Sequence, residues 1–94
     1  MIQLNQKVKP DPEVIATELD DKEAVLLHLG TKNYYSLNET GMRIWHMLSE
    51  GITLQGIHEK LQQEYDISPD HAEKCIIDLA KELISEKLLS VSDG

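Results

Sequence analysis

The chain has 94 residues, a length that fits one domain built around a single core. Its 17 acidic and 9 basic side chains give a net charge of −8, which opposes binding to nucleic-acid phosphates and to anionic membranes. The sequence shows no apolar run near the ~18 residues of a spanning helix, no signal peptide, and a single cysteine. We therefore expect a soluble cytoplasmic protein without disulfides.

The N-terminal third predicts an arm followed by a sheet. Residues 1–12 hold two prolines and no sustained period, so we expect an N-terminal arm or an irregular edge segment outside a domain of residues 13–91. Segments 14–19, 23–29 and 32–37 are rich in strand-forming residues, and the connectors between them have hairpin length. With Gly30 free to adopt a positive φ, these segments predict a three-stranded antiparallel sheet.

The rest of the chain predicts three helices. Asn38 is a capping residue before the first helix, and Gly51 ends that helix. Thr53 begins a short amphipathic helix, and Ser68 followed by Pro69 begins a third helix that runs to about residue 87. Residues 88–91 are expected to form a brief final strand or a docked tail. This order predicts an α+β fold of the winged helix-turn-helix type.

No pattern indicates catalysis, a cofactor or a metal. His71 and Cys75 are spaced i and i+4 on the third helix, but two ligands do not make a metal site, and Cys75 reads as a structural thiol. The sequence has no glycine-rich phosphate loop and no nucleophile elbow. A winged helix could place its third helix in DNA, yet this helix has more acidic than basic residues, which makes a DNA-binding regulator the weakest hypothesis.

The third strand and third helix together suggest a groove. On a helical wheel the third helix has two adjacent apolar stripes, the first of Ala72, Ile76, Leu79 and Leu83 and the second of Ile77, Ala80, Ile84 and Leu88. Either both stripes are core, or one of them lines a groove. The third strand is last in the meander, so its edge is open to an added strand. Such an edge suits a peptide, and equally a second copy of the chain acting as a homodimeric scaffold module.

The residues after the third strand carry a specific motif. The run from Tyr35 to Trp45, Y-S-L-N-E-T-G-M-R-I-W, resembles the PqqD-like family, and the similarity extends over residues 13–91. Its form is more similar to the broad family, including lasso-peptide members, than to the protein of pyrroloquinoline quinone (PQQ) synthesis. The resemblance implies a RiPP recognition element, a non-catalytic winged-helix domain that binds the leader segment of a ribosomally made precursor peptide.

The resemblance also implies a site and partners. The leader would add to the third strand beside the third helix and be presented to a modifying enzyme, such as a radical SAM protein or a leader peptidase. Carried over by position, the peptide-binding residues are Lys32, Asn33, Tyr34, Tyr35, Ser36, Lys74, Ile77, Lys81 and Ile84. Lys74 and Lys81 would suit an acidic leader residue. In the same comparison Leu37, Gly41, Ile44 and Trp45 are core residues rather than contacts.

Overall fold

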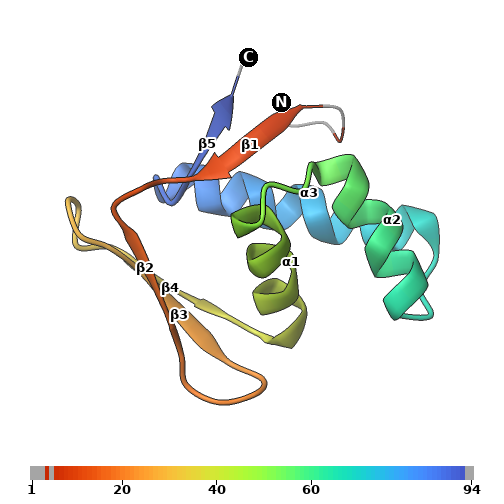
Figure 1. The fold of residues 1–94 in the computed structure, drawn as a ribbon, viewed down its shortest axis with the longest axis horizontal. Helices are drawn as coiled ribbons and strands as arrows, with labels where there is room; N and C mark the ends of the chain where they lie inside the picture. The colour runs from red at the N-terminus through yellow and green to blue at the C-terminus, as the bar shows by residue number, and fades with distance from the viewer. Residues whose placement is uncertain (1–3, 5, 93–94) are drawn as a thin grey trace.

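The computed structural model describes residue 4 and residues 6–92, and it forms two small antiparallel sheets around three helices (Figure 1). The strands are β1 Lys7–Pro10, β2 Val14–Glu18, β3 Ala24–His28, β4 Tyr34–Leu37 and β5 Leu89–Ser92, and the helices are α1 Glu39–Ser49, α2 Leu54–Glu64 and α3 Pro69–Ser85. One sheet has the order β2-β3-β4, and the other consists of β1 and β5. The predicted α+β class and three-stranded meander are confirmed, whereas the winged helix-turn-helix assignment stays a prediction.

Local capping interactions fix where each helix begins. The side-chain oxygens of Asn38, Thr53 and Ser68 accept hydrogen bonds from backbone N–H groups three residues later, at 2.8, 3.1 and 3.2 Å. Each bond satisfies a donor that the first helical turn leaves without a partner. All three predicted helix starts are therefore confirmed. Gly51, at φ 87°, ends the first helical segment in the left-handed conformation that glycine adopts without strain.

The core lies between the inner face of the three-stranded sheet and the three helices. Leu26 of β3 is fully buried, and the motif residues Leu37, Gly41, Ile44 and Trp45 are all buried, as expected. The buried residues of α3 are Ala72, Ile76, Ala80 and Leu83. The core stripe of α3 therefore takes members from both predicted stripes, and Leu79, Ile77 and Ile84 flank it half-buried.

The N-terminal segment differs from its prediction. Lys7–Pro10 form β1, which pairs antiparallel with β5, with Val8 opposite Val91 and Pro10 opposite Leu89. Leu4 and Val8 also pack against the core. This segment of little period, which ends at Pro10, forms a strand because β5 supplies the pairing, so the final segment is a strand and not only a docked tail. The expected irregular arm is thus wrong for residues 7–10, while residues 1–3 and 5 lie outside the described residues.

The turn between β3 and β4 also differs from its prediction. The positive φ in this turn, 67°, belongs to Lys32 and not to Gly30. Gly30 allows a close approach instead: a Cβ there would lie 3.0 Å from the ring of the buried His28 and 2.6 Å from Oε2 of Glu13, the end of a side chain that can move. Among the described residues, no helix is long and apolar enough to cross a membrane.

Candidate functional site

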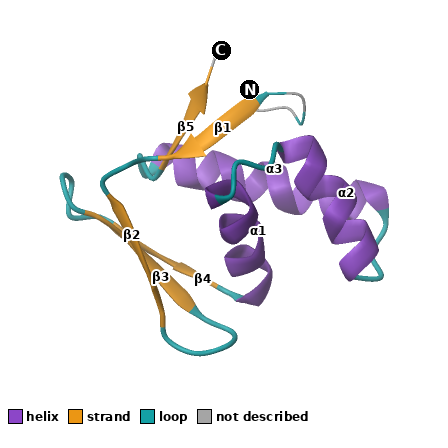
Figure 2. Cartoon of the chain, in the orientation of Figure 1, coloured by secondary structure: helices purple, strands orange, loops and turns teal. Residues whose placement is uncertain are grey.

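The strand β4 is an edge of its sheet (Figure 2). The N–H of His28 donates to the carbonyl of Asn33, directly opposite, at 2.9 Å. Because hydrogen-bonded and non-hydrogen-bonded pairs alternate along an antiparallel ladder, Tyr35 and Leu37 bond to β3. The N–H and C=O groups of Tyr34 and Ser36 then point away from β3, so β4 presents two donors and two acceptors along its open edge.

A groove of about 390 Å³ runs between this strand, the start of α1 and one flank of α3. Its lining residues are Tyr35, Ser36, Leu37, Asn38, Thr40, Gly41, Ile44, Cys75, Asp78, Leu79 and Glu82. Leu37, Ile44 and Leu79 supply apolar surface, while the two charged residues, Asp78 and Glu82, are both acidic. Leu37, Gly41 and Ile44 are buried as expected, but they also line the groove, so the expectation that they are core residues and not contacts holds only for their burial. The groove thus combines apolar surface, negative charge and an adjacent strand edge whose outward backbone groups have no partner among the described residues.

A hydrogen bond crosses the groove and links the strand to the helix. The phenol O–H of Tyr35 donates to Oε2 of Glu82. This hydrogen bond, helped by burial and by the negative charges of Glu82 and Glu86, raises the pKa of Tyr35 from 10.0 to about 12. Tyr35 therefore stays protonated at neutral pH, and β4 is held at a fixed position beside α3.

Of the strand residues predicted for the site, only some lie in the groove. Lys32 and Asn33 lie in the turn before β4, where the Lys32 N–H donates to the His28 carbonyl at 2.8 Å. Tyr34 is 72% exposed on the outer face of the sheet, whereas Tyr35 is half-buried on the inner face. Tyr35 and Ser36 line the groove. The predicted alternation of the two tyrosines is confirmed.

The four predicted helix residues do not line this groove. Lys74, Ile77, Lys81 and Ile84 lie on the flank of α3 opposite to the residues that do line it, which are Cys75, Asp78, Leu79 and Glu82. At about 100° per residue, the two sets lie on either side of the core stripe. Both flanks carry half-buried aliphatic residues, so the wheel alone does not indicate which flank faces β4. Which flank faces β4 depends on the side of α3 on which β4 lies in the folded protein.

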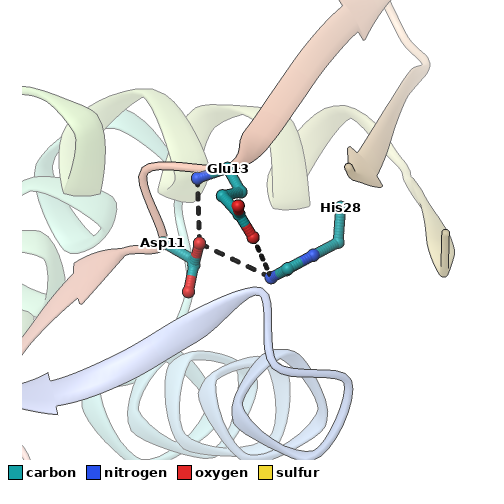
Figure 3. A group of neighbouring side chains, drawn as sticks. All are labelled: Asp11, Glu13 and His28. Atoms are coloured by element: carbon teal, nitrogen blue, oxygen red, sulfur yellow. Dashed lines mark hydrogen bonds and ion pairs between the residues drawn. The ribbon is translucent and has the colours of Figure 1, made fainter. Parts of the chain in front are cut away.

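A second polar cluster, which the sequence did not indicate, consists of Asp11, Glu13 and His28 (Figure 3). Nε2 of the buried His28 lies 3.5 Å from Asp11 Oδ1 and 3.9 Å from Glu13 Oε2. Its Nδ1 accepts hydrogen bonds from the N–H groups of Gly30 and Thr31, each at 3.0 Å.

The tautomer of His28 follows from these bonds. Because Nδ1 is an acceptor, the ring proton of neutral His28 sits on Nε2 and faces the two carboxylates. A metal ion at Nε2 would move that proton to Nδ1, against two N–H donors. The cluster of Asp11, Glu13 and His28 therefore links the start of β2 to the end of β3 and does not suit a metal ion; we call it the clasp.

The clasp also reaches α3. The Asp11 N–H donates to the carbonyl of Leu88, just after α3, at 3.1 Å. The three-stranded sheet is thus connected to the α3 segment at two places, through Asp11 and through Tyr35.

The fold and sequence are similar to known proteins. A solved structure of TbiB1 in complex with the TbiA(beta) leader peptide matches with a TM-score of 0.81 and 34% identity, covering 86% of this chain and 93% of that one. A solved structure of lasso peptide synthetase B1 complexed with the leader peptide matches with a TM-score of 0.78 and 25% identity, covering 88% of this chain and 96% of that one. A search of curated proteins found no match. The family model described as coenzyme PQQ synthesis protein D (PqqD) matches residues 23–89, and the chain belongs to this family.

Proposed function

We propose that this protein binds the leader segment of a ribosomally synthesised precursor peptide and presents it to a modifying enzyme. The observation that carries the proposal is the open edge of β4, placed directly beside the groove formed with α3. Two structurally similar proteins have each been solved with a leader peptide. We infer that the leader adds to β4 as an extra strand, since an unpaired edge is a template for strand addition.

The backbone geometry sets how the leader is held. An added strand can exchange up to four main-chain hydrogen bonds with Tyr34 and Ser36, each contributing about 0.5 to 1.5 kcal/mol net. Alternate leader side chains then point into the groove, where Leu37, Ile44 and Leu79 offer apolar contacts. After the cost of ordering a flexible segment, we expect an affinity in the micromolar to sub-micromolar range, which corresponds to a binding free energy of about −8 kcal/mol.

We infer a binding role and not a catalytic one. The groove contains one thiol, that of Cys75, whose Sγ lies 3.7 Å from Nε2 of His71. In the described part of the chain, no other side chain hydrogen-bonds the His71 ring, so the orienting third group of a catalytic triad is missing. The chemistry of modification then belongs to a partner enzyme, such as a radical SAM protein or a leader peptidase.

Calorimetric titration of the protein with the leader half of a precursor encoded beside its gene tests the proposal. The core half of the same precursor and a DNA duplex serve as controls. We expect saturable one-to-one binding of the leader alone, at micromolar affinity or tighter. If the folded protein gives no heat with the leader and instead elutes as a concentration-independent dimer, the open edge serves a second copy of the chain and the proposal is wrong.

A further inference from the structure

The charge of the groove is one-sided. Asp78 and Glu82 are its charged lining residues, and Glu86 continues the same flank of α3 by one more turn, close enough to Tyr35 to affect its pKa. Within the described ranges none of these three carboxylates forms an ion pair, and Asp78 has no hydrogen-bonding partner. Like charges spaced i and i+4 on a helix repel one another, so a cation bound between them relieves the repulsion.

The acidic residues matter because of where they lie. Asp78 and Glu82 lie, with Cys75 and Leu79, on the helix side of the groove, which adjoins the open edge of β4. Carboxylates one helical turn apart are separated by about 6 Å along the axis, and alternate side chains of an extended peptide by about 6.7 Å. If the added strand runs along α3, those of its side chains that point toward the helix match the spacing of Asp78 and Glu82.

Building on the proposed function, we propose that the groove selects leaders that carry a lysine or arginine on the side facing α3, with Asp78 and Glu82 as specificity-determining contacts. Tyr35 holds the Glu82 carboxylate beside the strand edge through its hydroxyl. The sequence alone suggested the opposite preference, for an acidic leader residue recognised by Lys74 or Lys81. Neither lysine lines the groove.

Neutral isosteric variants test the inference. Asp78→Asn and Glu82→Gln remove the charge and keep the shape of each side chain, while Glu73→Gln, at an exposed position on the same helix outside the groove, matches the change in net charge. Each protein is titrated with the leader half of the precursor encoded beside its gene and with variants of that peptide in which each Lys or Arg in turn is replaced by Gln. All titrations are run at low and high salt, and circular dichroism verifies folding.

We expect Asp78→Asn to weaken leader binding by about five- to tenfold and to reduce its salt dependence, with Glu73→Gln within about twofold of wild type. One leader variant should bind wild type and Asp78→Asn equally, which identifies the partner cation. If the leader binds but both groove variants match Glu73→Gln, or if the bound segment has no basic residue, the charge inference is wrong and peptide binding stands. If no leader binds the folded protein, both are wrong.

Discussion

Strand addition to β4 predicts that a proline at position 36 blocks the ligand without unfolding the protein. Ser36 lies opposite Val25 in a non-hydrogen-bonded pair, so its N–H faces the open edge and takes no part in the ladder. Ser36→Pro removes that donor and places the proline ring where an incoming strand would lie. Edge strands accept proline at such outward positions, and we expect a stability loss of at most about 1 kcal/mol.

The expected loss of affinity follows from the missing bond. A ligand carbonyl buried against position 36 without a donor costs about 1 to 3 kcal/mol. At about 1.4 kcal/mol per tenfold change, the dissociation constant rises by about 5- to 150-fold. Calorimetric titration with the leader peptide measures it, and urea unfolding verifies that the variant is folded.

A matched control exists on the opposite edge of the same sheet. The Leu19 N–H donates to the Glu23 carbonyl at 2.9 Å, which fixes the β2 ladder so that Ala16 also directs its N–H away from β3. Ala16→Pro therefore makes the same change at an exposed site on the opposite edge of the sheet, two strands away from β4. If Ser36→Pro binds within about threefold of Ala16→Pro, against the cost estimated for the unpaired carbonyl, strand addition to β4 is refuted.

Three further predictions concern the groove and the fold. Leu79→Asp should weaken leader binding at least about tenfold, because it places a charge in the groove, whereas Ile77→Asp on the other flank should leave titrations nearly unchanged. The raised pKa of Tyr35 means that its bond to Glu82 stabilises the fold fully below pH 10.0 and is lost as the pH rises through about 12. After allowance for solvent exposure we expect about 1 kcal/mol, seen as the difference in unfolding free energy between wild type and Tyr35→Phe that disappears across this window. Gly51→Ala should destabilise the protein by about 1 kcal/mol in urea unfolding, because alanine is strained at a φ of 87°. The added methyl would touch no neighbouring atom, so the strained backbone is the whole cost.

Local chemistry explains which elements the sequence predicts well. The helix starts at Asn38, Thr53 and Ser68 depend on a side-chain oxygen and an N–H three residues later, so a short stretch of sequence contains the whole interaction. The alternation in β4 likewise needs only neighbouring residues. The open edge of this strand follows from the order of the strands, which the hairpin-length connectors already imply.

The features that the sequence missed depend on contacts between distant segments. β1 is a strand because β5, more than 75 residues later, lies beside it. The choice between the two flanks of α3 depends on which side of the helix β4 occupies, and the flanks carry comparable mixtures of aliphatic and charged residues. The clasp of Asp11 and Glu13 with His28 brings together residues separated by a whole hairpin. Composition and periodicity describe the sequence locally, so neither predicts contacts between segments this far apart in the chain.

The two connections between the three-stranded sheet and α3 bear directly on binding. At one end His28 contacts Asp11, whose N–H is bonded to the Leu88 carbonyl, and at the other Tyr35 is bonded to Glu82. A groove between two separately mobile elements would have to order both when a ligand binds. Because these connections hold the strand edge against the helix beforehand, we expect the entropy cost of binding to fall mainly on the leader, so that the few main-chain bonds proposed for β4 are enough for useful affinity.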